Sequence, residues 1–235
     1  LVSADYPGEV CGAVEKSAGG ACVFLSGTIG GLMTPDIDHQ GVENDYRESA
    51  RIGARIAEIA LKALKNAPAD PRAAVSFSTA SIRLPLENSL YMLFLRNLTF
   101  GHRISDREGR PISSRRALWL TLRHLARFPL PESLRPWVES EVALLRLGRV
   151  RVLGIPGELF PELALGGYDG SYRFSHPLTG PANPNPPALA LAPKGPYLRE
   201  KLPRAAMIVG LANDELGYLL PEYDFQAAPT RLMRP

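Results

Sequence analysis

Hydrophobic residues recur along this chain with two different periods, one typical of helices and one typical of strands. In residues 43–66, Ile52, Ile56 and Ile59 follow one another at spacings of three and four, with arginine and lysine between them. Such spacing places the apolar side chains on one face of an amphipathic helix. Patterns and capping signals of this kind predict helices over residues 7–16, 43–66, 87–98 and 113–127.

Short apolar runs and alternating segments predict strands between these helices. Residues 21–25 form an apolar run that ends at Ser26 and Gly27, as expected for a strand buried on both faces. Residues 73–84 alternate, as expected for a strand with one buried face. Residues 141–147 and 150–155 predict a β-hairpin, and residues 205–211 predict a further strand.

The interleaving of helices and strands predicts an α/β fold, with a mixed β-sheet flanked by helices. Its length of 235 residues with 45% hydrophobic content favours a single domain over residues 1–235. Residues 101–111 are predicted to be an exposed loop. Residues 166–196, rich in glycine, proline and asparagine, are either a flexible linker or an ordered loop over a site.

The charge of the chain argues against a nucleic-acid partner. Its 27 basic residues are interspersed with 24 acidic ones, and the net charge of +3 supports only a weak preference for anionic surfaces. The arginines of residues 113–127 either meet a lipid headgroup surface or form a solvated helix face. The sequence has neither an apolar run long enough to cross a membrane nor a secretory leader.

Cysteine and histidine offer few candidate ligands. Cys11 and Cys22 lack the spacing of a metal or disulfide framework, and we expect them to be small buried side chains. His39 follows two aspartates in PDIDH (residues 35–39), which form either an oxygen and nitrogen metal site or a polar cap of the next helix. We expect surface or loop-packing roles for the remaining histidines, which are His102, His124 and His176.

Polar or glycine-rich turns follow three of the predicted strands. In open α/β sheets, ligands bind beyond the carboxyl ends of strands. Convergence of these turns would bring together a hydroxyl (Thr34), a carboxylate (Glu158) and a phenol (Tyr218). Taken separately, each residue also fits a structural role: Thr34 in a tight turn, Glu158 near a helix N-terminus and Tyr218 in a core.

Four segments along the chain carry a resemblance to a known family. They are LVSADYPG (residues 1–8), GGLMTP (residues 30–35), GIPGE (residues 154–158) and GLANDELGYLLPEY (residues 210–223). In this order they resemble segments of the N-terminal catalytic domain of the neutral/alkaline non-lysosomal ceramidases, which are zinc-dependent amidases. The chain therefore resembles a divergent member of that family, or a fragment that lacks its N-terminal part.

The resemblance implies a zinc-dependent amidohydrolase that cleaves the N-acyl bond of a ceramide-like lipid. It assigns Thr34 as the catalytic nucleophile and Glu158 and Tyr218 as zinc ligands. Residues expected to support the substrate or the loops are Gly30, Gly31, Asn213 and Tyr223. The family also implies sphingolipid metabolism, a secreted, periplasmic or cell-surface location, and a possible peripheral contact with a membrane surface.

The chain departs from the family pattern at several positions. Leu32 replaces the usual Asp or Asn of the nucleophile loop, Thr34 replaces Ser, and residues 214–217 lack a tyrosine. The two zinc histidines of the family are expected upstream of Leu1. These departures leave open a non-catalytic lipid- or glycan-binding module, or a hydrolase of a different amide. A metal-free hydrolase that uses Ser26 or Thr34 is disfavoured, because the sequence has no G-x-S-x-G motif.

Overall fold

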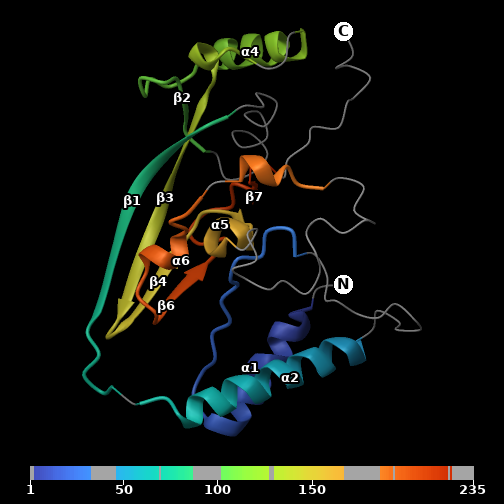
Figure 1. The fold of residues 1–235 in the computed structure, drawn as a ribbon, viewed down its shortest axis with the longest axis vertical. Coiled ribbons are helices and arrows are strands. Elements are labelled where there is room, and N and C mark those ends of the chain that lie inside the picture. Colours follow the sequence, from blue (N-terminus) through green and yellow to red (C-terminus); the bar gives the residue numbers. More distant parts are fainter. Residues whose placement is uncertain are drawn as a thin grey trace. The chain divides into compact units, whose positions relative to one another are not determined.

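The computed structural model of the protein describes residues 3–32, 46–68, 70–86, 102–126, 130–166, 186–192, 194–221 and 223 (Figure 1). Contacts divide the chain into two compact units. Unit 1 contains Leu1–Ser26 and Leu32–Ala74, and unit 2 contains Gly27–Gly31 and Val75–Pro235. The predicted helix over residues 87–98 lies outside the described residues, and the single domain over residues 1–235 stays a prediction.

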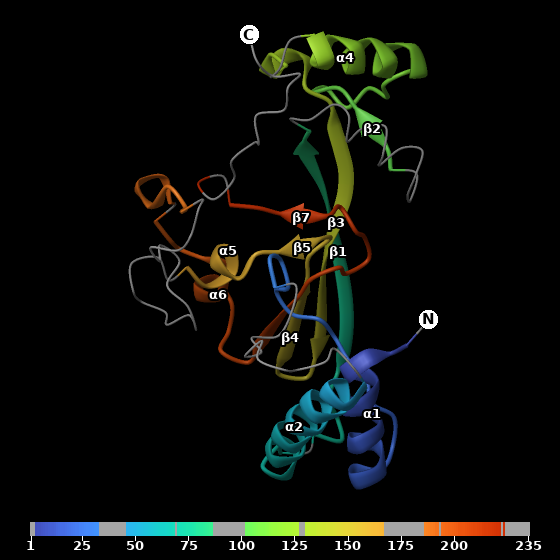
Figure 2. The same cartoon turned by 90° about the vertical axis from the view of Figure 1, so that its right-hand side faces the viewer.

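Unit 1 is a pair of helices, α1 (Asp5–Ala18) and α2 (Tyr46–Lys65), which confirms two predicted helices (Figure 2). Val10 and Ala57 are buried in this pair. Gly53 of α2 allows the two helices to approach each other closely. A Cβ atom at this position would lie 3.0 Å from the backbone oxygen of Tyr6 on α1 and would clash with the side chain of Glu9. The buried faces of the two helices therefore pack against each other within unit 1.

Residues 21–25 of unit 1 do not form the predicted buried strand. The segment is irregular, and the side chains of Val23 and Leu25 are exposed. The backbone N–H of Cys22 donates instead to the carboxylate of Glu15. The prediction was wrong because an apolar run becomes a strand only where a second strand pairs with it.

Unit 2 is built on a mixed sheet, which confirms the predicted α/β class. Its strands follow the order β1 (Val75–Pro85), β3 (Trp137–Leu147), β4 (Val150–Gly154) and β6 (Ala206–Val209), and β2 (Ile104–Ser105) also pairs with β3. Strands β1, β2 and β4 run antiparallel to β3, whereas β6 runs parallel to β4. Gly148, with φ of 55°, opens the two-residue turn of the confirmed β3–β4 hairpin.

One face of this sheet packs against a hydrophobic core. Val142, Leu153 and Ile208 contact the buried Ile155, Leu159 and Ala164. This core lies between the sheet and two short helices, α5 (Pro161–Leu165) and α6 (Leu198–Lys201).

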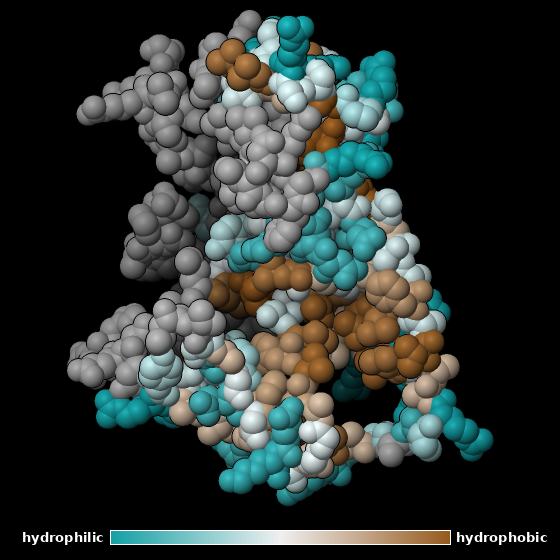
Figure 3. Space-filling view, turned by 180° about the vertical axis from the view of Figure 1, so that it is seen from behind, coloured by the Kyte–Doolittle hydropathy of each residue, from teal (hydrophilic) through white to brown (hydrophobic). Residues whose placement is uncertain are grey.

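The other face of the sheet carries exposed apolar side chains, which are visible in Figure 3. Phe77 is 61% exposed, and the register of the strands places it in one row with Val152 and with Met207, which is 47% exposed. The prediction of one buried face for residues 73–84 was therefore wrong for most of β1, whose residues 75–81 are all exposed. The alternation of a strand identifies its apolar side but not whether another layer covers it.

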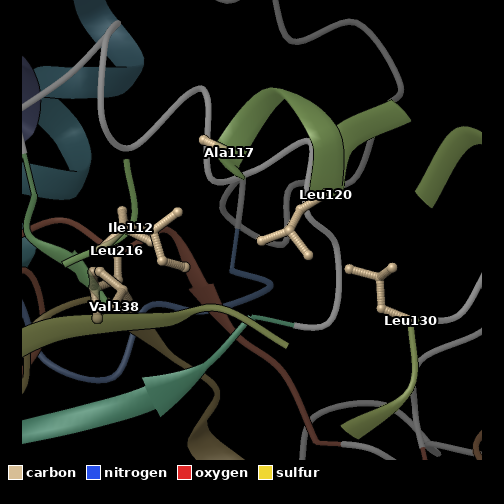
Figure 4. Close-up of a cluster of buried hydrophobic side chains, with 7 residues drawn as sticks. Ile112, Ala117, Leu120, Leu130, Val138 and Leu216 are labelled. Carbon is tan, nitrogen blue, oxygen red and sulfur yellow. The ribbon is translucent and has the colours of Figure 1, made fainter. Parts of the chain in front are cut away.

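A second core lies where β2 and β3 meet helix α4 (Ser114–Ala126) (Figure 4). Its buried side chains include Ile104, Leu120, Val138 and Leu216. Part of the predicted exposed loop over residues 101–111 is therefore buried, because β2 pairs with β3 and places Ile104 in this core. Unit 2 also has two short 3-10 helices, η2 (Glu132–Leu134) and η3 (Leu189–Leu191).

Unit 2 also contains a small parallel sheet of two strands, β5 (Glu158–Leu159) and β7 (Tyr218–Leu219). Both strands follow strands of the large sheet along the chain: β5 comes after β4, and β7 comes after β6. In the part of the chain that the structure describes, none of the helices has the length and apolar character needed to cross a bilayer.

Candidate functional site

The small parallel sheet brings Glu158 and Tyr218 together. They are register partners in the β5–β7 ladder, and the backbone N–H of Glu158 donates to the oxygen of Gly217 at 2.9 Å. Register partners on neighbouring strands have Cα atoms roughly 5 Å apart and point their side chains to the same face. The carboxylate of Glu158 and the phenol of Tyr218 are therefore neighbours on one face of the ladder.

Both side chains are open to a ligand. Glu158 is half-buried and Tyr218 is 49% exposed. The ring of Phe160 packs edge-on against the ring of Tyr218, with 6.2 Å between their centroids and an angle of 77° between their planes. Since Phe160 follows Glu158 by two residues, its side chain lies on the same side of the chain as that of Glu158. Its contact with the ring of Tyr218 helps to hold the tyrosine in place.

A glycine-rich segment lies directly against this pair of strands. The N–H of Gly30 donates to the backbone oxygen of Leu159 at 2.9 Å, and a Cβ atom at Gly30 would lie 2.6 Å from the oxygen of Glu158. Gly31 has φ of 77° and lies against the ring of Phe160. Only glycine fits this close approach without displacing β5.

The turns that follow three predicted strands do meet in the structure. The N–H of Gly210 donates to the oxygen of Gly27 at 3.1 Å, and the N–H of Leu211 donates to the oxygen of Gly157 at 3.0 Å. These bonds join the glycine-rich segment, the start of β5 and the segment that leads to β7. Backbone hydrogen bonds thus bring together the parts of the chain that hold the predicted ligands.

The predicted nucleophile Thr34 lies outside the described residues, as do Asp36, Asp38, His39 and His176. The role of Thr34 and the alternative metal site after it therefore stay predictions.

The two remaining support residues have different surroundings. Asn213, with φ of 65°, is exposed, and its amide Nδ2 donates to the Oε1 atom of Glu141 on β3 at 3.0 Å. Tyr223 is buried, and its backbone oxygen accepts a hydrogen bond from the N–H of Ala188 at 2.8 Å. Asn213 thus fastens the segment before β7 to the large sheet, whereas Tyr223 lies in the interior of unit 2.

A polar cluster that the sequence did not reveal lies beside Asn213. The Oδ1 atom of Asp214 is 2.6 Å from Nε2 of His102, and its Oδ2 atom accepts a hydrogen bond from the hydroxyl of Ser140 at 2.6 Å. The side chain of His102 is only 5% exposed, so of its two expected roles, at the surface or in loop packing, the structure supports loop packing. The pairing of β2 with β3 places His102 opposite Ser140, and no local pattern in the sequence indicates that pairing.

Hydrogen bonds determine the charge state of this cluster. Burial would raise the pKa of the Asp214 carboxyl, but the bonds from Ser140, His102 and the N–H of Glu215 hold that pKa below its ordinary value of 3.8. Asp214 therefore carries a negative charge at neutral pH, and Nε2 of His102 donates its proton to it. The cluster opens to a shallow cavity of about 490 Å³. Its lining residues are Ser81, Arg83, Glu139, Ser140, Glu141, Asn213 and Asp214.

The residues that the structure describes contain no cluster of three or more His, Cys, Asp or Glu side chains arranged for a metal ion. Glu158 and Tyr218 supply two oxygen atoms, and zinc accepts oxygen ligands of both carboxylate and phenolate type. The pair fits part of a zinc shell.

No protein-family model matches the sequence, and no curated protein matches it. Among solved structures, the crystal structure of neutral ceramidase from Pseudomonas aeruginosa is similar, with a TM-score of 0.48 and 15% sequence identity. The match covers 93% of this chain and 35% of the ceramidase chain, so this chain spans about a third of the length of that enzyme.

Proposed function

We propose that this protein is a zinc-dependent amidohydrolase that cleaves the N-acyl amide bond of a ceramide-like lipid. The observation that supports this function is the pairing of Glu158 with Tyr218 across the β5–β7 ladder. The sequence resemblance assigns zinc to these two residues, although they lie far apart along the chain. Their side chains meet on one face of a short sheet and are both reachable by a ligand.

Zinc in catalytic sites binds oxygen, nitrogen or sulfur ligands, keeps a position open for water or substrate, and can expand its coordination to five. Glu158 and Tyr218 would hold the ion through their oxygen atoms, and the family pattern adds two histidines. A bound zinc ion supplies Lewis-acid chemistry, because it polarises the amide carbonyl and lowers the pKa of a coordinated water or hydroxyl group.

The chain itself would position the nucleophile. Gly30 and Gly31 hold the start of the predicted nucleophile loop against β5, next to Glu158. Thr34 follows Gly31 by three residues, so covalent reach keeps its Cα atom within about 11 Å of that glycine. The Oγ1 atom of Thr34 would lose its proton and attack the carbonyl carbon of the amide. The C–N bond would break as the amine takes up a proton and leaves, and water would then hydrolyse the threonyl ester.

Helix α4 supports a lipid surface as the partner of this enzyme. Ala117, Leu120, Thr121 and His124 are buried, whereas Leu118, Trp119 and Leu122 on the opposite side are 56%, 47% and 57% exposed. The helix sequence SRRALWLTLRHLA contains arginines but no acidic residue. Exposed leucine and tryptophan beside arginine are typical of helices that lie in the headgroup region of an anionic membrane. A secreted or cell-surface location is part of the same proposal.

Metal content and lipid hydrolysis test the proposal on the full-length protein. We expect about one zinc ion per chain after dialysis, measured by mass spectrometry of the metal, and hydrolysis of a ceramide with a fluorescent acyl chain. Glu158→Ala should lose both properties, and Tyr218→Phe should weaken zinc binding. Glu58→Ala on the exposed face of α2 is the matched control and should retain both.

Thr34→Ala separates the nucleophile from the metal ligands. This variant should keep its zinc and lose hydrolysis, because Thr34 has no proposed part in metal binding. Full zinc content and activity in Glu158→Ala would refute the proposed site. A protein that binds zinc but hydrolyses neither ceramide nor other N-acyl amides would favour the non-catalytic binding module.

A further inference from the structure

The two cysteines of the protein lie close together in unit 1 and take no part in the proposed site. Cys11 is on α1, and Cys22 is on the segment that follows this helix. Both side chains are half-buried rather than fully buried as the sequence suggested, so both thiols are within reach of solvent.

Two contacts hold the segment of Cys22 alongside α1. The N–H of Cys22 donates to Oε1 of Glu15 at 2.8 Å, and the ring of Phe24 packs edge-on against the ring of Tyr6, with 5.8 Å between their centroids. Cys22 contacts Glu15, near the end of α1, and the later residue Phe24 contacts Tyr6, near its start. The segment therefore runs back along the helix, in the opposite direction. The chain reverses at Gly19 and Gly20, which both have positive φ.

This path brings Cys22 over the helical turn that contains Cys11. Glu15 follows Cys11 by four residues, so the two side chains lie on the same face of α1. Helical side chains lean towards the N-terminus, and the carboxylate of Glu15 therefore lies above the turn of Cys11. The backbone N–H of Cys22 is bonded to that carboxylate, and the thiol of Cys22 is hydrogen-bonded to the thiol of Cys11.

The ionisation of Cys22 reflects this neighbour. A hydrogen bond between the two thiols, followed by burial and by the charges of Cys11 and Glu15, raises the pKa of the Cys22 thiol above its ordinary value of 9.0. The thiolate is the reactive form of cysteine, so reaction at this residue should accelerate as the pH rises towards the alkaline range.

We propose that Cys11 and Cys22 form a disulfide site that is oxidised by thiol–disulfide exchange with a small-molecule disulfide. The thiolate of one cysteine attacks a sulfur of the reagent and releases one reagent thiol, which leaves a mixed disulfide. The thiolate of the other cysteine then attacks the protein sulfur of that mixed disulfide and releases the second reagent thiol. The Sγ–Sγ bond forms as the reagent accepts two electrons and two protons.

The bond would fasten residues 21–25 to α1 in place of a strand partner. It closes a short loop through Gly19 and Gly20, and it lies a few residues before the glycine-rich segment Gly27–Gly31. A disulfide that closes such a loop stabilises the folded state by restricting the unfolded chain.

Oxidation of the full-length reduced protein with oxidised glutathione tests this site. The reaction is quenched by alkylation of free thiols, followed by intact-mass analysis and peptide mapping. We expect the wild type to lose both alkylatable thiols, to lose the mass of two hydrogen atoms, and to yield one peptide in which Cys11 and Cys22 are linked. Cys11→Ser and Cys22→Ser each retain one cysteine and should stop at the mixed disulfide with glutathione.

A second measurement compares the folded protein with the protein in urea. The folded chain has already brought the thiols together, so closure of the mixed disulfide should be at least about tenfold faster than in urea. Folded wild type that keeps both thiols alkylatable would overturn the proposal. Accumulation of mixed disulfide to the level of the single variants, or of disulfides between two chains, would also overturn it.

Discussion

At the scale of single residues, Asp214 connects three separate segments of unit 2. Its carboxylate is bonded to His102 before β2, to Ser140 on β3 and to the N–H of Glu215. These bonds hold the start of the segment that leads to Tyr218. A single carboxylate thereby fixes one side of the candidate site to the large sheet.

Replacement of Asp214 should therefore cost stability. We expect Asp214→Ala to lower the free energy of unfolding by about 2–3 kcal/mol, because it removes charge-assisted hydrogen bonds and leaves their donors in a largely buried place. Urea denaturation followed by circular dichroism measures the change. Asp70→Ala, at an exposed carboxylate whose hydrogen bond is to the N–H of Arg72, is the control and should change stability by less than about 0.5 kcal/mol. An equally small effect at Asp214 would contradict this account of the cluster.

At the scale of elements, α4 has one face buried in unit 2 and another face that is apolar but exposed. Leu120 is fully buried, whereas Trp119 is 47% exposed and carries the guanidinium of Arg123 over its ring at 5.2 Å. An ordinary surface helix pairs a buried apolar face with a polar one. The outer face of α4 departs from this rule, which supports the lipid surface proposed as its partner.

Vesicle binding tests this role of α4. We expect the protein to sediment with vesicles that contain phosphatidylserine, and binding should weaken in high salt because the arginines act through charge. Substituting both Leu118→Ser and Leu122→Ser should weaken binding at least about fivefold. Leu64→Ser on α2, an equally exposed leucine, is the matched control and should leave binding unchanged.

Fluorescence gives a second readout for α4. Trp119 should shift its emission to shorter wavelength on binding, since its indole would leave water. Equal binding to neutral and anionic vesicles, or full binding by the double leucine variant, would contradict the role of α4.

At the scale of the whole molecule, several buried groups make stability depend on pH. Burial lowers the pKa of His124 below its ordinary value of 6.5, so the folded state disfavours its proton. Burial would raise the pKa of Asp106, but its bonds with Arg110 and the charge of Arg116 hold it below 3.8, as the cluster does for Asp214. The folded protein thus favours a neutral histidine and two ionised carboxylates.

Acidification should therefore destabilise the protein in two steps. Stability should fall as the pH drops below 6.5, because unfolding allows His124 to take up a proton. It should fall again below 3.8, as Asp106 and Asp214 are protonated and lose their bonds. Melting temperatures measured between pH 8 and pH 3 check both steps, and His124→Gln should reduce the slope of the first step. A slope between pH 6.5 and pH 5 that is identical in this variant would contradict the role of His124.

Local patterns in the sequence determined much of the secondary structure. The spacing of isoleucines in α2 and the glycine turn between β3 and β4 depend on residues near one another along the chain, and both predictions were confirmed. The same reasoning failed for residues 21–25. Their partners are Glu15 and Tyr6 of a helix, and an apolar run does not specify what lies beside it.

The sequence also determined which residue types were available for the candidate site. They were found in the segments that contain Gly30, Glu158 and Tyr218. Only the tertiary structure decided that Glu158 faces Tyr218, that His102 meets Asp214, and that Cys11 lies beside Cys22. Each of these pairs depends on strand register or on the path of a turn. Such non-local pairings are set by the packing of the whole unit, because no short segment contains both partners.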